Sequence, residues 1–563
     1  MEARQADTRK DGARQPSVWL SRLLSALFVL VLASSAFALL LQSPLSPLSI
    51  QYPGSESSLY LYSATQLLDG NVLYRDIFDV HAPLVSFIDT FGLFVGGPTG
   101  VWALEVAFLV LTLVLMFAAL RPYVGALATF LTCLFFVALV GYSLQGGNQA
   151  EEYALPFQVL ALAASMDCIV RRRITLPSIY LTGISAALTF FLKPDLVLFW
   201  LPFVVVICVM AIRQEGWALA LVHLVTLVFS AALVFVIILP WLYVNNALAS
   251  CYEQVVSFYR DCLSLVTPQE RLDALLYFVG RPSFVLTVVI SLFALVRQLL
   301  LCRSRPTVIP SGGAAGSSAA AEESLGPSAQ ASGAGSQLLD SGSPAPASRS
   351  QLPGEEGSLF GRSTLPLLMA NLAATLLVFA AMAYSGRPDE HLALQGLVCL
   401  VVPLAYLIDL AVRRVREGLG LRAVLGLALV VLLALSLAVP GVVTGASRIQ
   451  EQRTEDAALV EQREVVEAVR RNLAYDEPII VFGDDCWVYT AAGTYSATKY
   501  PAQPFSASFR PDLDSDFYRQ VGVAEAALLV GRLDEGSIER YPGIGDYRLV
   551  FKNARYEVYA HSE

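Results

Sequence analysis

Long apolar runs, each close to the length of one membrane crossing, recur along most of the chain. A helix needs about 20 predominantly apolar residues to cross the hydrocarbon core of a bilayer. Eleven segments meet or approach this length, and the fourth to sixth are short and closely spaced. The pattern therefore predicts about eleven transmembrane helices, at 23–41, 101–120, 124–141, 153–170, 178–192, 196–212, 218–240, 283–301, 364–384, 392–412 and 421–440.

Basic residues in the short connections predict the orientation of these helices. Lys and Arg gather in cytoplasmic loops. They occur in the N-terminal segment and again after alternate spans, at Arg121, 171–173, Arg213, Arg297 and Arg413 among others. With eleven spans, all of these positions fall on one side. We therefore expect the N-terminus in the cytoplasm and the C-terminal region outside.

Three polar segments separate or follow the apolar ones, and they divide the chain. We expect a cytoplasmic tail at 1–22 and a transmembrane region at 23–302 with a first outer loop at 42–100. A stretch at 303–362, rich in Ser, Gly, Ala and Pro, cannot bury enough apolar surface to fold, which predicts a disordered cytoplasmic linker. Further transmembrane helices follow at 363–440. Strand-like runs near 478–482, 526–530, 547–552 and 556–560, with a helix near 512–521, predict a small external α/β domain at 441–563.

Composition agrees with a membrane protein and excludes other classes. Of the 563 residues, 55% are hydrophobic and only 15% are charged, whereas an average soluble chain carries about 25% charged residues. The formal net charge is −9, so a nucleic-acid binder that works through a basic surface is excluded. The fold class predicted from these observations is an α-helical polytopic membrane protein.

The first outer loop concentrates polar chemistry. Ser57 or Ser58 can cap a helix whose face carries Tyr60, Ala64, Leu67 and Leu68, and a second helix can begin at Pro83. Glu56 is expected just before the first helix, where the macrodipole favours an ionised carboxylate. Such a group at a membrane boundary can act as a general base. On composition alone, however, a surface loop rich in Asp and Glu is usually just solvated.

A resemblance to a known family appears at this loop. The run GSESSLYLYSATQLLDGNVLYRDIFDVHAPL resembles the first outer loop of GT-C membrane glycosyltransferases. It is most similar to the protein-mannosyltransferase-like and aminoarabinose-transferase-like branch, glycosyltransferase family 39. The family pattern is an acid, an amphipathic helix ending in Gly, then Tyr-Arg-Asp and Lys-Pro-Pro-Leu. The resemblance implies a GT-C-like fold.

The resemblance assigns roles to individual positions. The catalytic acid of the family, usually Asp, falls on Glu56, and the Tyr-Arg-Asp element falls on Tyr74, Arg75 and Asp76. The family Lys, which faces a lipid phosphate, falls on His81. Glu for Asp lengthens the base by one methylene, and His for Lys replaces a fixed charge with a titrating group.

Two further outer segments carry candidate binding residues. Glu151 and Glu152 stand at the mouth of the fourth span, where carboxylates are costly unless they bind something. By the same resemblance, either of them would position the acceptor or hold a divalent metal; a hydrated helix start is the alternative. Lys193, between two spans, resembles a lysine that contacts the lipid phosphate, or is an interfacial lysine whose charge reaches the aqueous boundary.

The resemblance implies a glycosyltransferase that moves a monosaccharide from a polyprenyl-phosphate donor to an acceptor hydroxyl, with inversion. The acceptor would be a glycan, a lipid-linked molecule or a protein, on the external side of a plasma membrane. The chain has no Asn-x-Ser/Thr sequence, which favours a bacterial membrane. Two other classes remain open, a transporter or flippase of envelope lipids and a non-catalytic envelope assembly protein.

Overall fold

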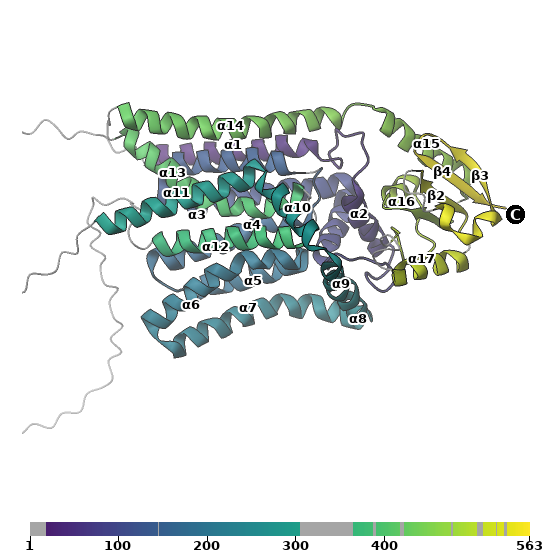
Figure 1. Ribbon diagram of the computed structural model, residues 1–563, viewed down its shortest axis with the longest axis horizontal. Helices are drawn as coiled ribbons and strands as arrows, with labels where there is room; N and C mark the ends of the chain where they lie inside the picture. Colours follow the sequence, from purple (N-terminus) through teal and green to yellow (C-terminus); the bar gives the residue numbers. More distant parts are fainter. Residues whose placement is uncertain are drawn as a thin grey trace, which may run out of the picture.

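The computed structural model describes residues 18–144, 146–304, 364–386, 390–416, 421–474, 477–503, 511–524, 526–533 and 538–562. It is an elongated helical bundle with a small α/β domain at one end (Figure 1). We call that end of the bundle the domain end. The predicted linker lies almost entirely outside the described residues, as does most of the predicted N-terminal tail.

The bundle consists of long apolar helices that run roughly along its length (Figure 1). They are α1 (Val18–Leu39), α3 (Pro83–Ser143), α4 (Ala150–Arg171), α5 (Leu176–Leu192), α6 (Leu201–Glu215), α7 (Trp217–Val244), α11 (Pro282–Ser304), α12 (Thr364–Tyr384), α13 (Leu394–Arg416) and α14 (Leu421–Glu451). Among the described residues, eight helices are long and apolar enough to cross a membrane. The chain is a multi-pass membrane protein.

All eleven predicted spans fall on these helices. The long helix α3 contains two of them, because its backbone leaves helical geometry at Gly96, Gly97 and Gly125. The fifth span, α5, is 17 residues long and the last is α14. The kink at Gly125 is adopted with φ +77°, a conformation that favours glycine.

Short elements connect the long helices. They are η1 (Leu40–Gln42), α2 (Ser55–Leu68), η2 (Pro194–Trp200), α8 (Leu248–Cys251), the π-helix η3 (Tyr252–Ser257), α9 (Phe258–Leu265), α10 (Pro268–Val279) and η4 (Glu390–Ala393). The predicted start of the loop helix is wrong by a few residues, because Gly54 is the N-cap of α2. Glu56 therefore lies within the first helical turn. Of the residues on the predicted apolar face, Tyr60 and Ala64 are buried, but Leu68 is exposed.

The last span does not end at Pro440 as the sequence suggests. Helix α14 continues through Pro440 to Glu451 and packs against α3. The contact is close, since a Cβ at Gly441 would lie 2.0 Å from the carbonyl oxygen of Ala138. Packing against a neighbouring helix supports the helix beyond the proline. The C-terminal domain accordingly begins after this helix.

The C-terminal domain contains a four-stranded sheet of order β1-β2-β4-β3. Strand β1 (Ile479–Phe482) is parallel to β2 (Leu528–Arg532), while β4 (Tyr556–His561) is antiparallel to both β2 and β3 (Tyr547–Lys552). The other elements are α15 (Ala457–Asn472), α16 (Trp487–Ala492), α17 (Pro511–Val523), η5 (Ile538–Arg540) and η6 (Pro542–Asp546). The prediction of a small α/β domain is confirmed.

The domain and the bundle share one apolar core. Phe191 of α5 and Leu242 of α7 belong to the same buried cluster as Val481 of β1 and Val530 of β2. The first outer loop lies between them, through Tyr62 of α2 and its neighbours. The domain is therefore packed onto the loop that carries the candidate chemistry.

Candidate functional site

Side chains from four connections of the bundle meet beside the start of α2. Glu56 comes from the first outer loop, Glu151 from the first turn of α4, Lys193 from the break between α5 and η2, and His391 from η4. The Nε2 atom of His391 lies 3.8 Å from Oε2 of Glu56 and 3.9 Å from Oε1 of Glu151. One imidazole thus bridges two carboxylates from different loops.

Glu56 is the accessible acid of this group. Its side chain is 35% exposed, whereas that of Glu151 is 1% exposed. Its position in the first turn of α2 places it at the positive end of the helix dipole, which stabilises the carboxylate. An ionised, partly solvated carboxylate can accept a proton from an incoming hydroxyl group.

Glu151 is held by cations and an amide. Lys193 Nζ forms an ion pair with its Oε1, and Nε2 of Gln395 donates to the same oxygen at 3.4 Å. A buried carboxylate is stable in this position only with such partners. The structure therefore distinguishes between the two adjacent acids, because Glu151 faces the group that contains Glu56.

His81 is oriented by a second acid. Asp79 is 1% exposed, and its Oδ1 lies 2.8 Å from Nδ1 of His81 and accepts the His81 backbone N–H at 2.9 Å. The imidazole packs edge-on against Tyr60, with ring centroids 4.9 Å apart. With Nδ1–H donated to Asp79, the Nε2 side remains for an anionic ligand.

The charge of His81 follows from the same contacts. Burial favours the neutral ring, but the hydrogen bond and charge of Asp79, assisted by the charge of Glu56, raise the pKa of His81 above its usual value. The ring therefore keeps its positive charge to higher pH than an ordinary histidine. A titrating residue can supply a cation here, as the lysine does in the resembling family.

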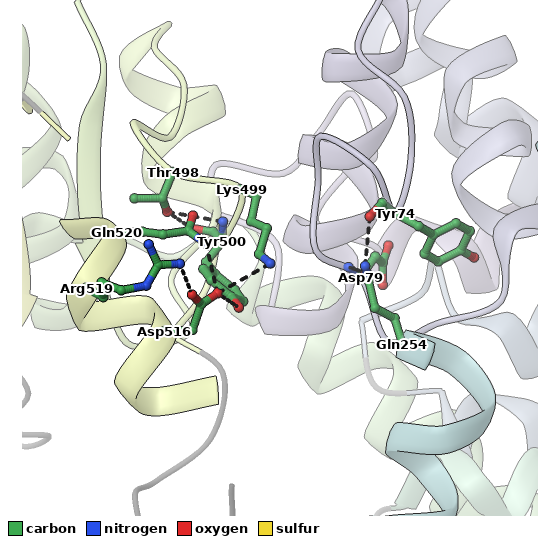
Figure 2. Close-up of polar contacts among 9 residues, drawn as sticks. All are labelled: Tyr74, Asp79, Gln254, Thr498, Lys499, Tyr500, Asp516, Arg519 and Gln520. Atoms are coloured by element: carbon green, nitrogen blue, oxygen red, sulfur yellow. Dashed lines mark hydrogen bonds and ion pairs between the residues drawn. The ribbon is translucent and has the colours of Figure 1, made fainter. Parts of the chain in front are cut away.

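The loop that carries Asp79 is fixed from the side. Gln254 of η3 accepts the backbone N–H of Asp79 at 2.9 Å and donates to the carbonyl oxygen of Tyr74 at 2.7 Å, as Figure 2 shows. The Tyr74 hydroxyl donates to the carbonyl oxygen of His81 at 2.7 Å. Tyr74 therefore supports the backbone of His81 from a buried position with φ +69°.

Arg75 and Asp76 make contacts of a different kind. Their side chains form an ion pair at 2.7 Å, and Arg75 Nη1 donates to the carbonyl oxygen of Asn245 at the end of α7. The hydrogen bond from Arg75 lowers the pKa of Asp76, which also accepts the Val72 backbone N–H. These contacts close a turn and tie the loop to α7, whereas Tyr74 reaches His81.

Glu152 lies in different surroundings from Glu151. Consecutive residues of a helix point in different directions. Glu152 is fully buried, and its charge acts on Glu105 of α3, which is also fully buried. Asp89 lies near this pair and accepts a hydrogen bond from Asn148 at 2.8 Å. Asn148 also donates to Ser57, beside Glu56.

Sequence reasoning missed part of this arrangement. By sequence, His391 is one of several basic residues in the connections that could complete an anion site, and its sequence context gives no sign that it reaches Glu56. Gln395 and Gln254 are ordinary polar residues by sequence. Glu105 does carry a signal, because an acid inside an otherwise apolar span points to function.

The predicted metal ligands do not form a metal centre among the described residues. No group of three or more His, Cys, Asp or Glu side chains there is arranged to hold an ion. Glu151 is bound by Lys193 and Gln395, and Glu152 lies with Glu105. The residues present thus do not fit a divalent cation, and we derive no step through one.

Several solved membrane proteins are similar in outline. ArnT from Cupriavidus metallidurans bound to undecaprenyl phosphate is 13% identical, with 96% of this chain and 98% of ArnT covered and a TM-score of 0.49. The oligosaccharyltransferase AglB from Archaeoglobus fulgidus, in complex with an inhibitory peptide and a dolichol-phosphate, is also 13% identical, with 97% and 75% covered and a TM-score of 0.49. Its complex with Zn and sulfate has a TM-score of 0.47 at 11% identity, with 95% and 73% covered. These scores lie below 0.5, so the function of this chain is argued from its own residues.

No curated protein matches the chain at a significant level. A family model does. The model for the N-terminal domain of competence-induced protein Ccs4 matches residues 18–305, which is more than half of the chain and includes every predicted site residue. The chain belongs to this family.

Proposed function

We propose that this protein is a membrane glycosyltransferase that moves a monosaccharide from a polyprenyl-phosphate donor to an acceptor hydroxyl. The observation that carries the proposal is the meeting of Glu56, His391, Glu151 and Lys193 from four separate connections. A solvated acidic loop gives no reason for such a meeting. The similarity of the first outer loop to glycosyltransferase family 39 supports the same assignment.

The donor is a lipid whose charged phosphate needs a cation at the membrane boundary. His81, held by Asp79, occupies the position of the phosphate-facing lysine in the resembling family. Its raised pKa favours the imidazolium form, which donates a charge-assisted hydrogen bond to a phosphate oxygen. The lipid tail lies among the spans, which keeps the sugar at a fixed depth beside Glu56.

The reaction is a single displacement. Glu56 accepts the proton of the acceptor hydroxyl while that oxygen attacks the anomeric carbon of the sugar. The bond between the anomeric carbon and the phosphate oxygen breaks, and polyprenyl phosphate leaves with both electrons of that bond. The negative charge on the leaving phosphate is stabilised by His81. One displacement inverts the anomeric carbon.

The site lies on the external face of a bacterial plasma membrane in this proposal. The basic connections predicted for the cytoplasm place the opposite end of the bundle outside. The C-terminal domain packs onto α2 and α16 contacts this helix directly. The acceptor, a glycan, a lipid-linked molecule or a protein, then reaches Glu56 beside this domain.

The test measures transfer of radiolabelled sugar from polyprenyl-phosphate donors in proteoliposomes. We expect Glu56→Gln to lower transfer by about 100-fold or more, and Glu56→Asp to retain part of it. Glu253→Gln, at an exposed acid of η3, is the matched control. Equal transfer by wild type and Glu56→Gln would remove the assigned base. Substrate uptake into sealed vesicles with no covalent product would favour a transporter instead.

A further inference from the structure

We propose that Lys193 is a built-in counter-ion that takes the place of a divalent metal at the Glu56–Glu151 site. The inference rests on the proposed function, since it concerns how the negative charges of the same site are balanced. It assigns Lys193 a positioning role, through Glu151, in addition to any contact with a donor phosphate.

The Glu151 carboxylate already has cationic and hydrogen-bonding partners. Its Oε1 is bound by Lys193 Nζ, receives Nε2 of Gln395 at 3.4 Å and lies 3.9 Å from Nε2 of His391. The Glu151 side chain is 1% exposed. A metal ion at this oxygen would have to displace the ammonium group, and two cations would then compete for one buried carboxylate.

The backbone conformation at Lys193 directs its side chain toward Glu151. Lys193 precedes Pro194, which disfavours helical geometry at the preceding residue. Its backbone is extended, with φ −160° and ψ 112°, and ends α5 before η2 begins. The break turns the side chain toward α4, where it meets Glu151. The extended backbone between α5 and η2 therefore fixes the position of the ammonium group.

Acidic side chains lie around the lysine. Glu151, Asp195 and Glu56 are all close enough for their charges to act on Lys193. Carboxylate oxygens are the preferred ligands of hard divalent cations. Without the ammonium group, these acids would lose a fixed positive charge and keep His391, a titrating group, as a basic neighbour. Removing the lysine is therefore expected to create an affinity for a cation that the wild type lacks.

The experiment titrates the purified full-length protein in detergent with Mn²⁺ alone, followed by electron paramagnetic resonance. Lys193→Met keeps the length of the side chain and removes its charge. We expect it to bind Mn²⁺ at least about tenfold more tightly than wild type, because acids that have lost their lysine counter-ion attract the ion. Lys193→Arg should behave like wild type. Lys499→Met, in the C-terminal domain, is the control and should show no gain.

Two results would overturn the inference. One is tight binding of Mn²⁺ by wild type, comparable with that of Lys193→Met. The other is a folded Lys193→Met variant, checked by thermal unfolding, with no gain in binding. If Lys193→Met does not fold, the wild type and Lys193→Arg decide, and tight binding by either contradicts the proposal. Because the probe is the metal alone, these results do not depend on whether the protein transfers sugar.

Discussion

The Nδ1 atom of His81 lies 2.8 Å from Oδ1 of Asp79, and the Asp79 side chain is almost fully buried. The same carboxylate oxygen also accepts the His81 backbone N–H. One of these hydrogen bonds orients the imidazole ring and the other holds the His81 backbone, and the Asp79 carboxylate raises the pKa of the ring. This pairing gives the proposed donor site a pH dependence that a lysine would not have.

Transfer is predicted to fall as pH rises through the His81 pKa. That pKa is raised in the folded protein, so the imidazolium persists above the ordinary histidine value of about 6.5. The contribution of the His81–Asp79 pair to the folding stability follows the same titration. It is complete below the pKa of His81 in the unfolded chain and is lost as pH rises through the pKa of His81 in the folded protein.

Asp79→Asn removes the charge that maintains the imidazolium. We expect the alkaline limb of the pH–rate profile to move to lower pH by about one unit. The profile of initial transfer rates measures this, with Glu215→Gln as the control, because Glu215 pairs with His223 at the α6–α7 turn instead. An unchanged alkaline limb in Asp79→Asn would contradict the role of His81.

His391→Ala is predicted to lower transfer by about tenfold or more, because Glu56 and Glu151 lose the imidazole between them. His391→Gln should retain more activity, since its amide keeps a polar N–H group between the two acids. Steady-state transfer rates measure both variants. His561→Gln, at the end of β4, is the matched control. Wild-type rates in His391→Ala would show that the bridge has no part in the reaction.

Gly441→Ala is predicted to destabilise the bundle by about 1–3 kcal/mol. A Cβ at this position would lie 2.0 Å from the carbonyl oxygen of Ala138, so α14 must move away from α3. Gly445→Ala, one turn further along the same helix, meets only Leu39 Cδ1 at 3.6 Å and should be neutral. Thermal unfolding in detergent compares the two. Equal stability would mean that the close approach is not required.

Tyr62→Phe is predicted to loosen the C-terminal domain. The Tyr62 hydroxyl accepts the backbone N–H of Ser496 at 3.0 Å, and both residues are buried. Leaving that N–H without a partner costs about 1–3 kcal/mol. Hydrogen exchange of the segment 487–500 should become faster, whereas the exposed Tyr252→Phe should leave it unchanged. Identical exchange in the two variants would exclude this attachment.

The sequence pattern predicted the bounds of a helix or strand well where no tertiary contact changes them. The strand at Tyr547–Lys552 has the predicted bounds, because its β-branched and aromatic residues favour an extended strand by themselves. The end of α14 was wrong, because packing on Ala138 outweighs the proline at 440. Here tertiary contact overrides a local rule.

The candidate site divides in the same way. Glu56 and His81 were expected from a motif within one loop. The contact of His391 with Glu56 and Glu151 joins residues from opposite halves of the chain, and no spacing in the sequence encodes it. The choice of Glu151 over Glu152 likewise required the direction of each side chain around α4.

The buried cluster that joins Phe191 and Leu242 to Val481 and Val530 has a practical consequence. The C-terminal domain is attached to the bundle through this packed core as well as through the chain that follows α14. Dividing the chain after α14 would expose apolar surface on both fragments. We therefore expect each fragment to aggregate when it is expressed by itself. Engineering of this protein should therefore keep the two halves on one polypeptide or co-express them.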